Sequence, residues 1–168
     1  SILPYYIANL NIEYTYKNKM GKYAEFKNIC FVDTLDNTEA LAYKGKQRAL
    51  FGLGSENAAR IRQQNGRKIS VVIGNPPYGK YKNKYSTYFS KPKMHQIELF
   101  FMHQGLQLLK PGGLLVYLTG SNFLRNGISY QFEKLLMEKL ADILDAYRLP
   151  PVFRYSKVPT DIIVLKRK

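Results

Sequence analysis

Hydrophobic residues along the chain change their spacing from one segment to the next, and helical spacing predicts several helices. The first helix is marked by apolar or aromatic residues three or four positions apart: Leu3, Ile7, Leu10 and Tyr14. A second is expected in "GSENAARIRQQNGRK", with Ser55 as its N-cap and Glu56 in its first turn. A broad apolar helix is expected over residues 96–109, ended by "KPGG", and another is marked by Ile128, Phe132, Leu135 and Leu136.

Short apolar runs between these helices predict strands. The runs are "ICFVDTL", "VVIG", "LLVYLTG", "ADILDAY" and "TDIIVLK". Val71, Val72 and Ile73 are β-branched, continuous and uncharged, which is typical of a buried parallel strand. Strands that alternate with helices predict an α/β sheet, and ligands of such sheets bind at the carboxyl ends of the strands.

Composition limits the class of protein. The chain has 168 residues, about one domain, and no apolar run long enough to cross a bilayer. Its formal charge of +14 favours a polyanion such as nucleic acid as partner, although a solvated basic surface accounts for the charge equally well. Without a signal-peptide pattern and with a single cysteine, Cys30, the expected location is a reducing cytoplasm, with no membrane partner.

A basic and aromatic segment, "GKYKNKYSTYFSKPKMH", follows the strand that contains "VVIG". Interleaved lysines and tyrosines suit phosphate contact and base stacking. The candidate nucleic-acid contacts are Lys80, Tyr81, Lys82 and Lys84. A flexible basic loop without a ligand fits the same residues equally well.

The sequence "NPPY" at the end of this strand suggests a specific chemistry. Two prolines fix the backbone, so that the Pro76 carbonyl and the Asn75 side-chain oxygen form a pair of hydrogen-bond acceptors. Such a pair matches an –NH2 group on a planar ring against which Tyr78 can stack, and the exocyclic amine of adenine fits. The structural alternative is a rigid turn formed by Pro76 and Pro77.

These residues resemble the adenine-N6 DNA methyltransferases of restriction-modification systems, particularly the methyltransferase region of large single-polypeptide enzymes. "IELFFMHQGLQLLKPGGLLVYLTGSNFL" and "VPTDIIVLKRK" are similar to the segments that follow the catalytic motif in that family. The resemblance implies S-adenosylmethionine as cofactor and duplex DNA with a flipped adenine as partner. It implies a partial Rossmann-like, S-adenosylmethionine-dependent methyltransferase fold, with a mostly parallel sheet and an antiparallel last strand.

The resemblance also implies roles for individual residues. Asn75, Pro76, Pro77 and Tyr78 correspond to the catalytic motif. Asp33 corresponds to an acidic residue at the adenine of the cofactor, although an Asp after a strand equally often caps a turn or helix.

Two further residues carry weaker expectations of the same kind. Glu98 corresponds to an acidic residue near the methionine end of the cofactor, and a surface carboxylate in a first helical turn is the alternative. Phe153 is a candidate second wall of the base pocket, and a core aromatic is the alternative.

The chain departs from the family because no glycine-rich cofactor loop and no ribose-binding carboxylate can be identified. "GLGSEN" follows "KGKQRALF" instead of a buried strand. Residues 1–168 are therefore interpreted as one partial catalytic domain, inactive alone, that requires the remainder of the same enzyme or a complementing chain. The side of strand 71–73 exposed by this truncation favours self-association.

Other chemistries receive less support. His95 and His103 have no accompanying ligand set for a metal, and Cys30 lacks the preceding proline of cytosine-C5 methyltransferases. Two alternatives remain open: a protein glutamine-N5 methyltransferase, whose target is also a planar –NH2 group, and an inactive nucleic-acid-binding remnant.

Overall fold

The computed structural model describes residues 3–30, 53–79, 96–125, 128–151 and 158–168. The chain forms two compact units, Ser1–Arg67 and Lys68–Lys168. In these described ranges, no helix combines the length and the hydrophobicity that a bilayer span requires. Most of the predicted strand "ICFVDTL" lies outside the described residues.

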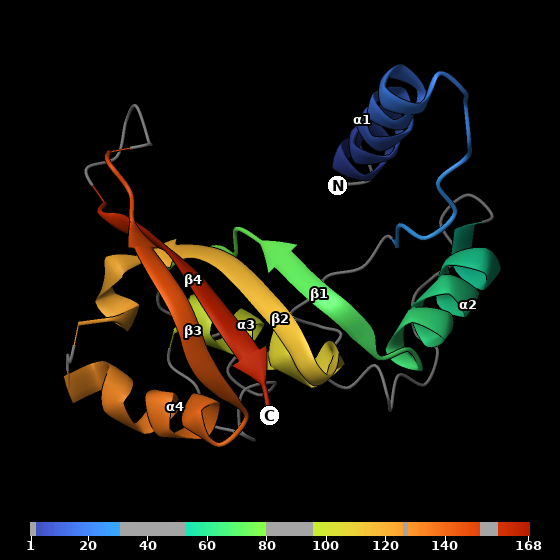
Figure 1. The fold of residues 1–168 in the computed structure, drawn as a ribbon. Coiled ribbons are helices and arrows are strands. Elements are labelled where there is room, and N and C mark those ends of the chain that lie inside the picture. The colour runs from blue at the N-terminus through green and yellow to red at the C-terminus, as the bar shows by residue number, and fades with distance from the viewer. Residues whose placement is uncertain (1–2, 31–52, 80–95, 126–127, 152–157) are drawn as a thin grey trace. The chain divides into compact units, whose positions relative to one another are not determined.

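The first unit contains helices α1 (Leu3–Met20) and α2 (Leu53–Asn65), and the predicted helix at the start is confirmed as α1 (Figure 1). Glu13 of α1 is buried, and its carboxylate accepts hydrogen bonds of 2.9 Å from the Tyr23 hydroxyl and the Phe26 amide. Arg60 of α2 donates to the Tyr5 hydroxyl at 3.2 Å, which ties the two helices together. The predicted N-cap is wrong, because α2 already begins at Leu53 and Ser55 therefore lies inside its first turn.

The second unit contains a four-stranded sheet. Its strands are β1 (Ile69–Gly74), β2 (Leu109–Gly120), β3 (Ala141–Arg148) and β4 (Thr160–Arg167), in the order β1-β2-β4-β3. β1 pairs with β2 in parallel, and β4 pairs antiparallel with both β2 and β3. Three strands therefore run in one direction, and the predicted antiparallel last strand is confirmed.

Helices α3 (Ile97–Leu108) and α4 (Ile128–Glu138) lie on one face of this sheet, with α3 behind it in the view of Figure 1. Gly105 of α3 approaches the sheet so closely that a Cβ there would lie 2.7 Å from Leu115 Cδ1 and 2.8 Å from Tyr117 Oη. Leu115 is paired with Leu165, which also lines a cavity beneath α4. Because cross-strand partners share a face, both helices cover the same side.

β1 differs from its prediction as a buried strand. Its partner is β2, and Val71 and Ile73 are 53% and 78% exposed, although Val72 faces α3. β1 is an edge strand of the described sheet, and its alternate residues point to the face opposite the two helices. The parallel pairing was predicted correctly, but the burial was wrong because β1 has one strand neighbour in the described sheet.

β2 begins earlier than expected. α3 ends at Leu108 and β2 starts at Leu109, so "KPGG" lies inside the strand instead of before it. The pairing shifts between Ile69↔Leu109 and Val71↔Leu114, which places the extra residues of β2 in an irregularity of the ladder. Gly112 provides the backbone conformation for it, with φ of 77°.

Candidate active site at the carboxyl end of β1

The site begins where β1 stops. Gly74, the last strand residue, is paired with Tyr117, and Asn75 follows it directly. Pro76 and Pro77 cannot donate to a β-ladder, which explains why pairing ends there. Asn75 is exposed and the next residue, Pro76, is buried, so the Asn75 side chain is accessible from solvent although the chain turns into the protein directly after it.

Tyr78 connects the ends of two strands. Its hydroxyl lies 2.7 Å from Asn75 Oδ1 and 3.2 Å from the Leu118 carbonyl oxygen of β2. Burial raises the pKa of Tyr78, and the nearby Glu98 charge adds to the increase, so the hydroxyl remains a donor at neutral pH. In this structure the Tyr78 hydroxyl therefore donates to Asn75 Oδ1, the oxygen that the sequence predicts to accept from a target amine.

The residue after Tyr78 is held at the start of α3. The Gly79 amide donates to Glu98 Oε2 at 3.1 Å, and the Gly79 carbonyl accepts from the Ile97 amide at 2.9 Å. Glu98 is 5% exposed. The φ of Gly79 is 122°, a conformation that residues with a side chain rarely adopt.

At the same end of the sheet, β2 and β3 stop and β4 begins. Gly120, the last residue of β2, pairs with Thr160, the first residue of β4. The end of β3 is fixed to β4 by an ion pair between Arg148 and the fully buried Asp161, and the Leu149 amide donates to the Thr160 carbonyl at 3.0 Å. The chain thus leaves β3 and enters β4 at the end of the sheet where Asn75 lies.

The structure brings together five of the site residues expected from the sequence: Asn75, Pro76, Pro77, Tyr78 and Glu98. The others lie outside the described residues, namely Asp33, Lys80, Tyr81, Lys82, Lys84 and Phe153. The sequence did not predict two parts of this site. The first is the Leu118 main-chain carbonyl, which any residue type would supply. The second is Gly79, which its position directly after "NPPY" could have indicated.

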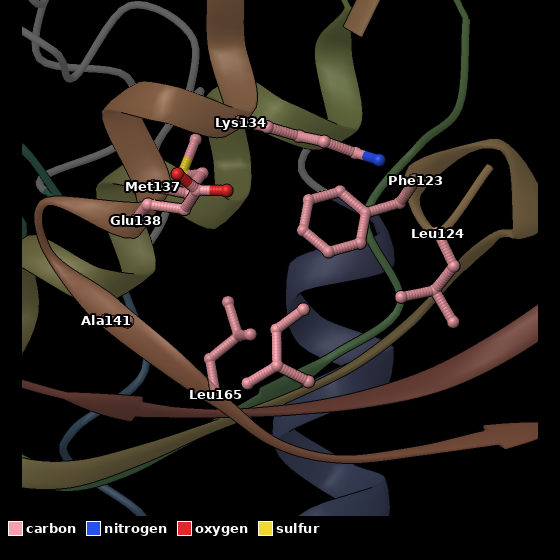
Figure 2. Close-up of a pocket in the computed structure, with 8 residues that line it drawn as sticks. Phe123, Leu124, Lys134, Met137, Glu138, Ala141 and Leu165 are labelled. Carbon is pink, nitrogen blue, oxygen red and sulfur yellow. The ribbon is translucent and has the colours of Figure 1, made fainter. Parts of the chain in front are cut away.

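A cavity of about 220 Å³ lies elsewhere in the same unit, between α4 and the sheet. Phe123, Met137 and Leu165 are among its apolar walls (Figure 2). Lys134 Nζ lies 5.7 Å from the centre of the Phe123 ring, and burial lowers the pKa of this lysine. No asparagine is among the described residues that line this cavity, whereas the side chain of Asn75 at the end of β1 is an exposed amide. In the part of the chain that the structure describes, no group of three His, Cys, Asp or Glu side chains could hold a metal ion.

Comparison with known proteins connects this geometry to a family. The Eco57I restriction-modification methylase family matches residues 4–153. A chain in the cryo-EM structure of a DrdV–DNA complex is 28% identical with a TM-score of 0.76, over 99% of this chain and 19% of that one. A chain of the Type ISP restriction-modification enzyme LlaGI, bound to a DNA substrate mimic, is 18% identical with a TM-score of 0.76, over 100% of this chain and 17% of that one.

The fold also matches a Listeria monocytogenes structure assigned to the class I S-adenosylmethionine-dependent methyltransferases. That match has 19% identity and a TM-score of 0.53, over 68% of this chain and 42% of the other. The predicted methyltransferase fold and the resemblance to restriction-modification methylases are confirmed. No curated protein matches the sequence. The chain spans less than a fifth of the DrdV and LlaGI chains.

Proposed function

Because the chain belongs to the Eco57I restriction-modification methylase family, we propose that it is the catalytic segment of a DNA adenine-N6 methyltransferase that uses S-adenosylmethionine. One observation supports this assignment most directly. An exposed asparagine, Asn75, directly follows a parallel strand and precedes two prolines and a tyrosine whose hydroxyl bonds back to it. That arrangement is suited to an amine on a planar ring, which adenine provides.

Asn75 and Pro76 act on the amine through hydrogen bonds. The lone pair of an aromatic amine is delocalised into the ring, so the nitrogen is a weak nucleophile. When the Asn75 side-chain oxygen and the Pro76 carbonyl accept its two hydrogens, a pyramidal nitrogen with a directed lone pair is favoured. S-adenosylmethionine bound here would supply the methyl group with its sulfur as leaving group, while Asn75 and Pro76 would direct the nitrogen lone pair toward that methyl and one amine proton would pass to water.

The end of β1 carries hydrogen-bond acceptors, which are compatible with a positively charged cofactor. Bound S-adenosylmethionine supplies a methyl group on a positively charged sulfur. The acceptors at this strand end, Asn75 Oδ1 and the Leu118 carbonyl, would suit the positive charge that the amine nitrogen gains when it receives that methyl group. Asp33, outside the described residues, is the proposed contact to the adenine ring of the cofactor.

Tyr78 must change partners when the base enters. Its hydroxyl leaves Asn75 Oδ1 and retains the Leu118 carbonyl, so that the amide oxygen becomes available to the amine. The ring then stacks on the flipped adenine, with Phe153 as the proposed opposite wall. Extrusion of the base costs a few kcal/mol, which DNA contacts offset.

DNA contact is proposed for the basic segment after Gly79, through Lys80, Tyr81, Lys82 and Lys84. The DrdV and LlaGI structures hold DNA and a DNA mimic, and a formal charge of +14 favours the same partner here. We expect this chain alone to bind DNA weakly, without sequence preference and with strong salt dependence. Filter binding at low and moderate salt tests this, and unchanged affinity would contradict it.

Cofactor binding and target recognition are proposed to need other segments, supplied by the same enzyme or a complementing chain. No glycine-rich cofactor loop can be identified in the sequence, so we infer that this chain alone does not hold the methyl group beside Asn75, and positioning can supply roughly 7–11 kcal/mol of a barrier. We therefore expect the 168-residue chain alone to bind the cofactor poorly and to leave DNA unmethylated. Calorimetric titration and incubation with labelled cofactor test both expectations. Micromolar binding with label in adenine would contradict them.

The function is tested in a preparation that contains this chain and the segments it needs. Asn75→Ala should reduce adenine methylation by more than about 100-fold while cofactor binding stays unchanged, because Asn75 contacts the amine and not the cofactor. Asn11→Ala, an exposed asparagine of α1, is the matched control and should behave as the unaltered protein.

The identity of the labelled product separates the remaining alternatives. N6-methyladenine in digested DNA supports the proposal, and label in a protein glutamine supports the glutamine-N5 alternative. No label in either would favour an inactive nucleic-acid-binding remnant. Near-normal adenine methylation by Asn75→Ala would refute the role of the asparagine.

A further inference from the structure

Glu98, which lies outside the "NPPY" motif, accepts a hydrogen bond from the residue that follows the motif. It is the second residue of α3 and is 5% exposed, yet it carries a carboxylate. A buried carboxylate is costly unless hydrogen bonds compensate for lost water. One of those bonds comes from the Gly79 amide, at 3.1 Å from Oε2.

The second polar group of Gly79 is held by the same helix. Its carbonyl accepts from the Ile97 amide at 2.9 Å, so both main-chain groups of Gly79 are bound to the first turn of α3. A Cβ on Gly79 would meet nothing within 4 Å, so a side chain at this position would have no packing partner among the described residues. The turn after Tyr78 is therefore set by these two hydrogen bonds.

Tyr78 depends on this turn because it is the residue before Gly79. The Tyr78 hydroxyl is held by hydrogen bonds to Asn75 and Leu118. The Tyr78 backbone is held through the next residue, Gly79, whose amide donates to Glu98. When the base enters and the hydroxyl loses Asn75, the Leu118 carbonyl and the backbone restraint from Gly79 are the two that remain. A shift of about 1 Å in such a group can reduce a rate by about 100-fold.

We propose that Glu98 is a positioning residue, whose carboxylate holds the Gly79 amide and thereby the ring of Tyr78 against the target base. This inference rests on the proposed function. It differs from the expectation that Glu98 contacts the methionine end of the cofactor, because the carboxylate acts through the backbone of the loop. The two roles predict different effects of the same substitutions.

The experiment compares Glu98→Ala and Glu98→Gln in the preparation described for Asn75. The glutamine retains an oxygen that can accept from Gly79 and removes the charge, while the alanine removes the acceptor. For Glu98→Ala we expect kcat to fall by about 10- to 100-fold with cofactor affinity within about twofold of normal. Glu98→Gln should recover most of the rate. Glu25→Ala, an exposed glutamate paired with Lys27, is the control and should change nothing.

Amide hydrogen exchange at Gly79 gives a second measurement that does not need activity. Exchange should accelerate at least about tenfold in Glu98→Ala and return toward normal in Glu98→Gln, because a lost acceptor frees the amide. Thermal melts of each variant identify any general unfolding. If the alanine variant unfolds, the glutamine variant alone decides between the two roles.

Two results would overturn the inference. Weaker cofactor binding in Glu98→Gln with unchanged exchange at Gly79 would make Glu98 a cofactor ligand. Normal rate and normal exchange in both variants would leave it without a positioning role. No methylation of adenine by the unaltered protein would refute the proposed function instead, and exchange at Gly79 would still support or overturn the contact.

Discussion

Strands β4 and β1 are built from similar residues but lie in opposite environments. "DIIVL" of β4 places Ile163 and Leu165 at 0% and 2% exposure, whereas "SVVIG" of β1 leaves Val71 and Ile73 at 53% and 78%. β4 lies between β2 and β3, and β1 is paired with β2 at the edge of the described sheet. Residue type thus favours the extended conformation in both strands, and the neighbours of each strand decide what is buried.

The same difference separates the two faces of the sheet. The face beneath α3 carries Leu115, Tyr117 and Ile163, each at most 6% exposed. Val71 and Ile73 belong to the other face, since Val72 between them points toward α3. Stability should therefore depend strongly on the first face and weakly on the second.

The largest expected effect comes from a matched pair of isoleucines. Ile163→Ala should lower the free energy of unfolding by about 2–5 kcal/mol, because it creates a cavity in a packed region. Ile73→Ala should change it by less than about 0.5 kcal/mol, because the side chain is already in water. Urea unfolding followed by circular dichroism measures both. Equal losses in the two variants would show that Ile73 is covered.

A matched pair of glycines tests the packing under α3. Gly105→Ala should destabilise by about 1–3 kcal/mol, because its Cβ would lie 2.7 Å from Leu115 Cδ1 and 2.8 Å from Tyr117 Oη. Gly120→Ala should be nearly neutral, because its Cβ would meet nothing within 4 Å. Urea midpoints of the two variants provide the measurement. A stable Gly105→Ala protein would mean that α3 is packed less closely than described.

Much of this fold could be predicted from local sequence. The spacing of apolar residues is a local property, so the helix at the start and the strands "ADILDAY" and "TDIIVLK" were located correctly. The start of α2 was misplaced at Ser55, since a serine tolerated in a first helical turn is hard to distinguish from a cap. The burial of Val71 depends on segments distant in sequence, which no local pattern contains.

The candidate site shows the same limit. Asn75 and Tyr78 were predicted together because they are three residues apart in one motif, and the bond between them lies within that distance. The Glu98 bond to Gly79 spans 19 residues and the Tyr78 bond to Leu118 spans 40. Long-range contacts to main-chain atoms have no residue signature, so only the folded chain reveals them.

Tyr117 should make the helix-covered face sensitive to alkaline pH. Burial raises the pKa of Tyr117 from 10.0 to about 12, so the folded state binds the phenolic proton more tightly than the unfolded state. Its contribution to stability is complete below about pH 10 and is lost as the pH rises toward about 12. Tyr117→Phe should therefore lose less stability than the unaltered protein between about pH 10 and about pH 12. Urea midpoints across that range measure it, with Tyr14→Phe, an exposed tyrosine, as control.

The smallest expected effect on folding is paired with a change in association. Val71 and Ile73 lie on an exposed edge strand, and such edges recruit other strands unless a charge prevents pairing. The 168-residue chain alone should therefore self-associate as its concentration rises, which covers this surface.

Ile73→Lys should abolish association without altering the urea midpoint, because the side chain is 78% exposed in the single chain. Leu135→Lys, at an apolar position of α4 that is 56% exposed, adds the same charge away from the edge and should associate normally. Sedimentation velocity over a range of concentrations distinguishes these outcomes. A monomeric unaltered chain, or an Ile73→Lys variant that still associates, would show that β1, at the edge of the described sheet, is not the surface responsible.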